Sequence, residues 1–568
     1  MTTVAELFAA RAQDDHVGLR FEDASWTWRE VVAASRRRAA LLEATRGDGP
    51  FHVGVLLENV PEFVFLLGGA ALCGATIVGI NSTRRGEELA RDIRHTDCGL
   101  VVTEASLAGL LDGLDIGVDA RRVLVADSPA YRAALDTAAP SPPAASSAGP
   151  AACDDPAALY LLLFTSGSTG APKAVRVSQG RIAGAALAMA TGSGFGPDDV
   201  LYCAMPMFHG NALNSCVIPA VAAGATLALR RRFSASAFLP DVRRLGATYF
   251  NYVGRALAYV LATPPSDHDR DNRLRFGFGT EASPQDISSF RRRFGCPIVE
   301  GYGSSEGAIS MTRVPGTPRQ ALGKPPPGMD VVIADPATGQ ECAPAAFDES
   351  GRLLNADDAI GEIVASDGVA RFEGYYANDE ANAQRTRDGW FWSGDLGYRD
   401  EDGFFYFAGR PADWLRVDGE NFAAAPVERV LARFPGIVSA AVYPVPDPRT
   451  GDQVMAALEL VPGGTFDAGA FAGFLAGEPD LGTKWAPRFV RIVDHLPVTG
   501  TNKMDKRPLR DQGWDPPGPC EVFWREGGLE GGYRPLTPAD AAGLREEFER
   551  NGRGSFLRRE EETRHLGG

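Results

Sequence analysis

The feature that most constrains this chain is the segment TSGSTGAPKAV at residues 165–175, which is rich in glycine and in hydroxyl side chains. It follows the apolar run Leu159–Phe164 and leads into the alternating run Ala174–Ser178, and both runs are typical of strands. Glycines allow backbone N–H groups to turn toward an anion, and the hydroxyls and Lys173 add further donors. The sequence therefore predicts a phosphate-binding loop between two strands.

Two alternatives compete with a phosphate-binding loop. A Walker-type loop needs the pattern G-x-x-x-x-G-K-[ST] between a strand and a helix. Here the lysine lies three residues after Gly170, across Pro172, and a strand is predicted to follow. Walker chemistry is therefore excluded, whereas a surface loop without a ligand stays open on this segment alone.

Length, charge and cysteine content limit the class of protein. A chain of 568 residues with 44% hydrophobic content is too long for one core and predicts two or more domains. The net charge of −16 excludes nucleic acid as an expected partner and suits a soluble enzyme. The eight cysteines have no C-x-x-C spacing, and the start of the chain lacks the regions of a signal peptide, so we expect a cytoplasmic protein with reduced thiols.

One apolar stretch invites a membrane interpretation. Residues 63–80 carry no charge, which puts them at the length threshold for a membrane span. Because four glycines interrupt the stretch, we instead predict a helix Pro61–Cys73 that ends at Gly74, followed by a buried strand at 75–80. No stable membrane insertion is expected.

The order of apolar runs predicts the fold class. Strand-like and helical stretches alternate from about residue 50 to 300, which favours an α/β body with largely parallel sheets. Short strands from about 360 to 408 indicate a smaller β subdomain, and a compact α/β unit follows residue 410. We predict a large N-terminal domain at 1–410, a small α+β domain at 411–515 and a partly disordered extension at 516–568.

Five further motifs follow the glycine-rich loop at ordered spacings. They are AMPMFHGN at 204–211, GFGTEASP at 277–284, GYGSSEG at 301–307, WSGDLG at 392–397 and LPVTGTNK at 496–503. Together the six motifs resemble those of the adenylate-forming superfamily, which includes acyl-CoA synthetases, peptide-synthetase adenylation domains and beetle luciferases. The resemblance runs from about residue 5 to 515, and six weak motifs in the same order are highly specific.

Within the superfamily the chain most resembles the fatty acid transport protein and very-long-chain acyl-CoA synthetase branch. The segments that carry this resemblance are FEGYY at 372–376, DGENF at 418–422 and GYRPLTP at 532–538. The resemblance implies ATP, Mg²⁺ and coenzyme A as cofactors and co-substrates. It also implies two steps: a carboxylate attacks the α-phosphorus of ATP to give acyl-AMP and pyrophosphate, and CoA then displaces AMP.

The resemblance implies a role for each matched residue on the nucleotide. The β- and γ-phosphates are expected to be held by residues of the glycine-rich loop, namely Thr165, Ser166, Gly167, Ser168, Thr169, Gly170 and Lys173. Tyr302 is expected to stack on adenine, and Gly279, Thr280 and Glu281 to line the other side of the base. The neighbouring positions Gly301, Gly303 and Ser304 are also expected at the nucleotide. Asp395 is expected to accept hydrogen bonds from the ribose hydroxyls, and Arg410 to contact ribose or phosphate.

The remaining roles concern catalysis and the thiol. Glu306 is the expected Mg²⁺ ligand, since a hard cation prefers carboxylate oxygen, and Ser305 is expected to bond the α-phosphate. Lys503 is expected to stabilise charge during adenylation, and His209 to border the acyl channel. Gly419 and Glu420 are expected on the loop that faces the pantetheine tunnel after the mobile small domain rotates.

Each of these residues has a plainer interpretation, and two departures leave questions open. Asp395 could be a turn residue, Tyr302 or His209 a core residue, and Glu306 a solvated loop acid. The hinge position is Ala412 where the superfamily usually has Asp or Lys, and the lysine loop allows a slip from Lys503 to Lys506. These departures leave open whether both half-reactions run efficiently.

Three functional hypotheses follow. The first is an acid–CoA ligase that acts on a hydrophobic carboxylic acid, by default a fatty acid. The second is an enzyme that mainly forms the acyl-AMP of a specialised acid, for example a polycyclic terpenoid or steroid acid, and passes it to a partner. The third, of another class, is a non-catalytic lipid-transport or membrane-associated binding protein. The expected partners are the acid and CoA, and a homodimer is left open.

Overall fold

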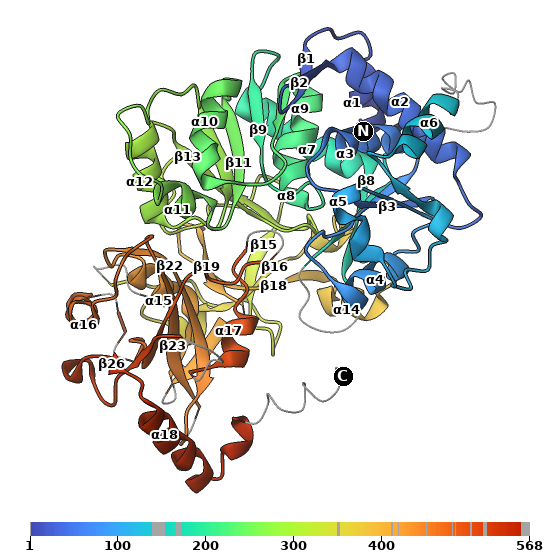
Figure 1. Ribbon diagram of the computed structural model, residues 1–568. Helices are drawn as coiled ribbons and strands as arrows, with labels where there is room; N and C mark the ends of the chain where they lie inside the picture. Colours follow the sequence, from blue (N-terminus) through green and yellow to red (C-terminus); the bar gives the residue numbers. More distant parts are fainter. Residues whose placement is uncertain are drawn as a thin grey trace. The chain divides into compact units, whose positions relative to one another are not determined.

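The computed structural model divides the chain into two compact units, each described by itself (Figure 1). The first unit contains Met1–Ala282, Ile287–Met311 and Ser366–Phe391, and the second contains Ser283–Asp286, Thr312–Ala365 and Trp392–Gly568. The structure describes residues 2–138, 154–165, 172–348, 353–410, 413–417, 420–449, 451–479, 481–482, 484–499, 503–514 and 520–557. The predicted site residues outside these ranges are Ser166, Gly167, Ser168, Thr169, Gly170 and Gly419, together with the side chain of Glu420.

The first unit contains a six-stranded sheet in the order β6-β5-β3-β4-β7-β8. Its strands are β3 (His52–Leu56), β4 (Thr76–Gly79), β5 (Leu100–Thr103), β6 (Val123–Val125), β7 (Leu159–Phe164) and β8 (Ala174–Ser178). All neighbours pair in parallel except β7 and β8, which are antiparallel. The two strands predicted on either side of the glycine-rich loop therefore form as predicted, and they pair with each other.

An eight-stranded sheet in the order β14-β13-β12-β11-β9-β10-β1-β2 forms the other half of this unit. Its strands are β1 (Val17–Phe21), β2 (Ala24–Thr27), β9 (Val200–Cys203), β10 (Thr226–Leu229), β11 (Tyr249–Val253), β12 (Phe276–Thr280), β13 (Ile298–Gly303) and β14 (Ser310–Thr312). The neighbours from β13 to β1 pair in parallel, so their carboxyl ends lie at one edge.

Helices accompany these sheets, and one continuous core contains residues of both sheets and of the helices beside them. The helices are α1 (Val4–Ala10), α2 (Trp28–Ala44), α3 (Pro61–Cys73), α4 (Gly86–His95), α5 (Ala105–Ala108), α6 (Pro129–Thr137), α7 (Gln179–Ser193), α8 (Gly210–Ala212), α9 (Ile218–Ala223), α10 (Ala235–Leu245), α11 (Ala256–Leu261), α12 (Pro284–Phe294) and α14 (Asp379–Arg385). A π-helical turn, Leu213–Val217, connects α8 to α9.

Helix α3 has the bounds that the sequence predicts. Pro61 opens it, and Gly74 ends it in the left-handed conformation with φ +73°. The helix is buried almost throughout because it lies in the core of the first unit. Among the described residues, no helix is both long and apolar enough to cross a membrane.

The second unit contains a β subdomain and a small α/β part. In the subdomain β15 (Val331–Ala334), β16 (Gly361–Ala365), β18 (Trp390–Arg399) and β19 (Phe405–Gly409) are sheet neighbours in this order, and α13 (Ala356–Ala359) precedes β16. The short strand β17 (Thr386–Arg387) pairs with the start of β18. The hairpin of β20 (Trp414–Val417) and β21 (Glu420–Ala423) opens the small part.

The small part is built on one sheet of five strands. Its strands are β22 (Ile437–Pro446), β23 (Asp452–Leu460), β24 (Phe489–Val493), β25 (Val522–Trp524) and β26 (Arg534–Pro535). Alternate residues of β22 and β23 belong to two different cores because successive side chains of a strand point to opposite faces. One core includes α15 (Ala424–Leu431) and α16 (Ala468–Gly477), and the other includes α17 (Arg507–Gln512) and α18 (Pro538–Arg550).

Candidate active site

Three of the predicted motifs gather at the carboxyl edge of the eight-stranded sheet. His209 follows β9, Gly279 and Thr280 end β12, and the segment 301–306 lies at the end of β13 and just after it. Parallel strands bring such segments to one edge, where ligands of open α/β sheets bind. Glu281 follows β12 with a positive φ of 71°.

Two glycines allow a close approach at this edge. A Cβ atom on Gly279 would lie 2.3 Å from the carbonyl oxygen of Tyr252, so no side chain fits there. A Cβ atom on Gly210 would lie 3.5 Å from Oγ of Ser305, which puts the segment after His209 against the serine predicted to bind the α-phosphate. The structure thus brings two motifs together that are about a hundred residues apart in sequence.

Glu306, the predicted Mg²⁺ ligand, is only 7% exposed. Its Oε1 accepts a hydrogen bond of 2.7 Å from the hydroxyl of Tyr375. The guanidinium of Arg181 donates to the backbone oxygen of Ser305. Burial lowers the pKa of Arg181, and the charges of Glu373 and Glu306 oppose this shift. A buried carboxylate with basic side chains nearby therefore forms the centre of the candidate site.

The base of the glycine-rich loop is closed by the backbone. The N–H of Thr165 donates to the carbonyl of Lys173 over 3.1 Å, which continues the β7–β8 pairing by one step. The Nζ atom of Lys173 lies 6.0 Å from the ring centroid of Tyr375. Burial lowers the pKa of Lys173, the charge of Arg385 lowers it further, and Glu306 opposes both. Lys173 and Glu306 are thus close enough to influence each other.

Tyr375, Arg181 and Arg385 were missed as site residues by the sequence analysis. The segment FEGYY at 372–376 was used only as a marker of one superfamily branch. Nothing in a single sequence indicates that Tyr375 contacts Glu306, because the two residues are 69 positions apart. The available signal was the apolar–aromatic composition of the segment, which is equally typical of a core strand.

Asp395 and Arg410 meet in the second unit. Nε of Arg410 lies 3.0 Å from Oδ1 of Asp395, with the arginine side chain 51% and the aspartate side chain 14% exposed. The pair forms because β18 and β19 are antiparallel, with Leu396 opposite Gly409. The backbone N–H of Asp395 donates to Oγ of Ser393. A carboxylate held by a half-exposed arginine is suited to accept hydroxyl groups of a sugar.

Lys503 pairs with Thr499 in the small part. Val498 and Met504 form an antiparallel bridge, the N–H of Thr499 donates to the carbonyl of Lys503 over 2.7 Å, and the N–H of Lys503 donates to Oγ1 of Thr499 over 3.2 Å. Lys506 lies outside this pairing. Its Nζ is 2.8 Å from Oε1 of Glu428, and its side chain is 10% exposed.

The donor set at Glu306 fits a magnesium ion that is shared with phosphates. No group of three His, Cys, Asp or Glu side chains that could cage a metal ion was found among the described residues. Mg²⁺ is usually bound through one or two carboxylates together with substrate phosphates and water. Glu306 is one buried carboxylate that meets this requirement. Lys173 and Arg181 lie near it, and their positive charges would help to neutralise the phosphates.

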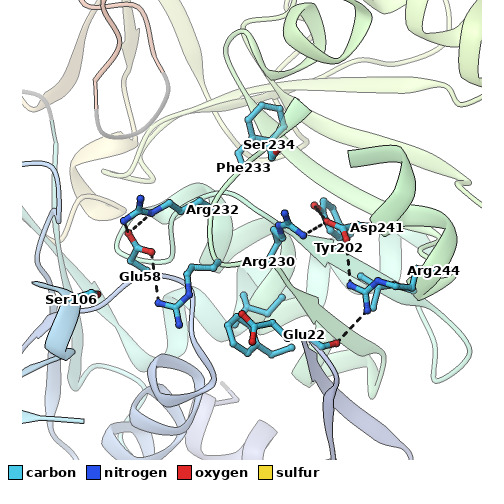
Figure 2. A pocket seen from close by; sticks show the side chains of 14 residues that line it. Glu22, Glu58, Ser106, Tyr202, Arg230, Arg232, Phe233, Ser234, Asp241 and Arg244 are labelled. Carbon is cyan, nitrogen blue, oxygen red and sulfur yellow. Dashed lines mark hydrogen bonds and ion pairs between the residues drawn. The ribbon is translucent and has the colours of Figure 1, made fainter. Parts of the chain in front are cut away.

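A separate cavity of about 560 Å³ lies in the first unit (Figure 2). Its arginines are paired with carboxylates: Arg230 lies 2.7 Å from Asp241, and Arg232 contacts Glu58. Arg231, also in its lining, lies 2.7 Å from Glu104. None of the site residues predicted from the sequence lines this cavity. Its positive charge is balanced by acids, so it lacks the excess charge that an anion site needs.

Comparison with known proteins decides the family. The model of the AMP-binding enzyme family matches residues 7–376, and that of the AMP-binding enzyme C-terminal domain matches residues 426–503. The chain belongs to the AMP-binding enzyme family. The adenylate-forming superfamily and the α/β fold class predicted from the sequence are thereby confirmed.

Similar proteins cover nearly the whole chain. A steroid-22-oyl-CoA synthetase from Rhodococcus jostii (strain RHA1) is 53% identical over 560 residues, which cover 98% of this chain and 99% of the relative. The medium/long-chain-fatty-acid–CoA ligase FadD17 from Mycobacterium tuberculosis (strain ATCC 25618 / H37Rv) is 45% identical over 512 residues, which cover 90% and 96%. The crystal structure of the anthranilate CoA ligase AuaEII has a TM-score of 0.76 at 20% identity, covers 90% of this chain and 96% of that one, and supports the fold.

Proposed function

We propose that this protein is an AMP-forming acid–CoA ligase that activates a hydrophobic carboxylic acid. It would convert the acid and ATP into acyl-AMP and pyrophosphate, and then transfer the acyl group to CoA. The observation that carries the proposal is the 53% identity to a steroid-22-oyl-CoA synthetase over 98% of the chain. Relatives named for steroid and for medium- and long-chain fatty acids share a hydrophobic acid as substrate.

The acid that we favour is a steroid or similar polycyclic acid, because the relative named for a steroid acid is more similar over more of the chain. A fatty acid, the default from the sequence alone, is the second candidate. The fatty acid transport protein branch remains part of the proposal on the strength of the segments at 372–376 and 418–422. We also propose a cytoplasmic location, with the acid and CoA as partners.

The geometry supports distinct roles for residues of the first unit. The backbone at Thr165 and the ammonium of Lys173 would hold the outer phosphates, and the hydroxyl of Ser305 would bond the α-phosphate. Glu306 would hold Mg²⁺, which supplies charge neutralisation on the phosphates when bound. Tyr302 would stack on the flat base, and the segment 279–281 would line the other side of the base.

Residues of the second unit would complete the reaction. Asp395 would accept the ribose hydroxyls, with Arg410 keeping its carboxylate oriented. Lys503 would stabilise the negative charge that develops as the carboxylate attacks the α-phosphorus. Adenylation is followed by thioester formation, in which the CoA sulfur bonds to the acyl carbon and AMP leaves.

One assay separates the three functional hypotheses. The purified protein is incubated with ATP, Mg²⁺ and either a C22 steroid acid or a series of fatty acids, with and without CoA, and pyrophosphate, AMP and acyl-CoA are measured. We expect acyl-CoA and AMP in equal amounts, with the highest kcat/KM for the steroid acid. Pyrophosphate release without acyl-CoA would favour an adenylating enzyme that serves a partner. Absence of ATP turnover with every acid would overturn the proposal.

A further inference from the structure

We propose that Tyr375 is a positioning residue that holds Glu306 in the orientation needed for Mg²⁺-dependent nucleotide binding, and that Arg385 orients the tyrosine. This inference rests on the proposed function, because it requires that Glu306 is the Mg²⁺ ligand. It concerns residues 372–385 of the first unit, here called the bracket segment. The segment ends at the carboxyl end of α14 and contributes no residue to the sequence-predicted site.

The bracket segment is paired with the strand that leaves the glycine-rich loop. Tyr375 forms an antiparallel bridge with Val175, the N–H of Arg176 donates to the carbonyl of Gly374 over 3.0 Å, and the N–H of Tyr376 donates to the carbonyl of Ala174 over 2.8 Å. These bonds extend the edge of β8 by a further strand-like segment. The position of Tyr375 along β8 is therefore fixed by the backbone.

A side-chain bond ties the same segment to the loop itself. Nδ2 of Asn378 donates to the carbonyl of Pro172 over 3.1 Å. The side chain of Asn382 bonds both backbone groups of Tyr375. Its Oδ1 accepts from the N–H of Tyr375 over 2.7 Å, and its Nδ2 donates to the carbonyl of Tyr375 over 3.1 Å. Tyr375 thus has little freedom to shift relative to the base of the loop.

The direction of the hydrogen bond to Glu306 follows from the partners. Nε of Arg385 lies 3.2 Å from the Tyr375 hydroxyl, and that hydroxyl lies 2.7 Å from Oε1 of Glu306. A guanidinium can only donate, so the hydroxyl oxygen accepts from Arg385 and its proton points to Glu306. The tyrosine is only 2% exposed, so water does not compete readily for this bond. The carboxylate is held in one orientation by a chain of two bonds.

A second contact of the bracket segment supports the residue before Glu306. The carboxylate of Glu373 accepts from the N–H of Ser178 over 2.8 Å and from its hydroxyl over 2.6 Å, and it lies 3.5 Å from Nη1 of Arg181. Arg181 in turn donates to the backbone oxygen of Ser305. The bracket segment therefore supports both residues, Glu306 through Tyr375 and Ser305 through Arg181. Residues that orient metal ligands in this way tune metal affinity without touching the metal.

The neighbouring tyrosine provides a matched control. The hydroxyl of Tyr376 also bonds a carboxylate, Oδ2 of Asp97, over 2.7 Å. Tyr376 is more exposed than Tyr375, and Asp97 is not a predicted site residue. The variants Tyr375→Phe and Tyr376→Phe therefore each remove one hydroxyl–carboxylate bond from adjacent positions, and only the first removes a bond to the candidate metal ligand.

The experiment measures direct binding of ATP as a function of Mg²⁺ concentration, without acid and without CoA. For Tyr375→Phe we expect the Mg²⁺ concentration that gives half-maximal ATP binding to rise about 10-fold, as is common when a residue behind a metal ligand is lost. ATP binding in excess EDTA should stay within about 2-fold of the unsubstituted protein, since the phenyl ring is retained. Tyr376→Phe should match the unsubstituted protein in both measurements.

The outcomes distinguish this inference from the proposed function. An unchanged Mg²⁺ dependence for Tyr375→Phe, or an equal shift for Tyr376→Phe, would overturn the inference. Should Tyr375→Phe not fold, Arg385→Met removes the orienting donor together with the positive charge that acts on Lys173. Loss of that charge alone would favour Mg²⁺, so a rise in the Mg²⁺ concentration for half-maximal ATP binding reports the lost orientation, and no rise would overturn the inference. If the unsubstituted protein binds Mg²⁺ and ATP yet forms no acyl-CoA, the proposed function fails and the inference stands; if it binds no nucleotide, both fail.

Discussion

The Nζ atom of Lys506 lies 2.8 Å from Oε1 of Glu428, and the same carboxylate oxygen accepts a 2.8 Å bond from the N–H of Val442. Lys506 therefore links the end of the lysine loop to α15 and β22 inside the small part of the second unit. To reach a nucleotide, Lys506 would have to give up its contact with Glu428, whose side chain is 21% exposed. The relationship supports Lys503 as the lysine of the adenylation step.

Substitution of Lys503 and of Lys506 is expected to affect different properties: pyrophosphate exchange for the first and stability for the second. We expect Lys503→Ala to lower pyrophosphate exchange by roughly 100-fold or more, because a charge that stabilises the transition state is lost. Its unfolding temperature should hardly change, because the two hydrogen bonds between Thr499 and Lys503 do not use the lysine side chain. Lys506→Ala should instead lower the free energy of unfolding by about 1 kcal/mol, because Glu428, whose side chain is 21% exposed, loses its cation.

The measurements are pyrophosphate exchange and thermal unfolding on both variants. Equal losses of exchange in folded Lys503→Ala and Lys506→Ala would contradict the assignment. A Lys506→Ala protein with unchanged stability would show that the Glu428 contact contributes nothing. Lys484→Ala, at a third lysine of the small part, serves as the control for general charge effects.

Local elements of the fold could be predicted from the sequence, and long-range pairings could not. The bounds of α3 follow from Pro61 and Gly74, and the strands β7 and β8 follow from their apolar patterns. The bridge between Val175 and Tyr375 joins residues two hundred positions apart, so no local pattern encodes it.

The same limit applies to the candidate site. The sequence predicts Glu306 and Lys173 by motif, and the structure brings both near one tyrosine. The tyrosine itself and Arg385 become site residues only through the packing of the bracket segment. Lys503 and Lys506 could not be separated by sequence alone, because the partner of Lys506 lies on a helix about eighty residues earlier.

The ion pair between Asp395 and Arg410 predicts an effect on ATP affinity. Asp395→Asn keeps the shape of the side chain but removes the charge that holds Arg410 and that accepts hydroxyl groups strongly. We expect the KM for ATP to rise about 10-fold, with a smaller fall in kcat, since hydrogen bonds to a charged group contribute about 1.5–3 kcal/mol. Steady-state kinetics with varied ATP provide the measurement.

A second ion pair of the same strand provides the control. Arg399, also on β18, contacts Glu341 in the β subdomain. Glu341→Gln should leave the KM for ATP unchanged, because this pair lies outside the predicted site. If Glu341→Gln raised the KM as much as Asp395→Asn, the effect would reflect the stability of the subdomain and not the ribose contact.

Gly279 predicts a steric effect at the edge of β12. A Cβ atom there would lie 2.3 Å from the carbonyl oxygen of Tyr252, a backbone atom that cannot move alone. Gly279→Ala should therefore force β11 and β12 apart, lower stability by about 1–3 kcal/mol and weaken ATP binding. Gly184→Ala in α7 is the matched control, since a Cβ atom there meets nothing within 4 Å and should stabilise the helix by about 1 kcal/mol. A stable Gly279→Ala variant with normal ATP affinity would refute the steric argument.

Asp92 predicts a pH dependence of stability. The residue is fully buried on α4, with Nε of Arg84 2.9 Å from its Oδ2. Burial raises the pKa of Asp92 to about 6, although Arg84 opposes the shift. Between the unfolded pKa near 3.9 and the folded value, the native state holds a proton that the unfolded state has lost, so stability falls as pH rises through this window. Two pKa units correspond to a loss of about 3 kcal/mol, complete above pH 6.

Asp92→Asn removes this titration while keeping the size of the side chain. Relative to the variant, the unsubstituted protein should therefore lose stability between pH 4 and pH 7, as measured by hydrogen exchange of α4 amides or by urea unfolding of the first unit. Glu88→Gln alters a side chain that is 69% exposed on the same helix, so the stability difference between this variant and the unsubstituted protein should not change in this way with pH. A stability difference between Asp92→Asn and the unsubstituted protein that stays constant across this range would mean that the Arg84 contact keeps Asp92 ionised throughout. The buried pair would then act as a fixed salt bridge and not as a titrating group.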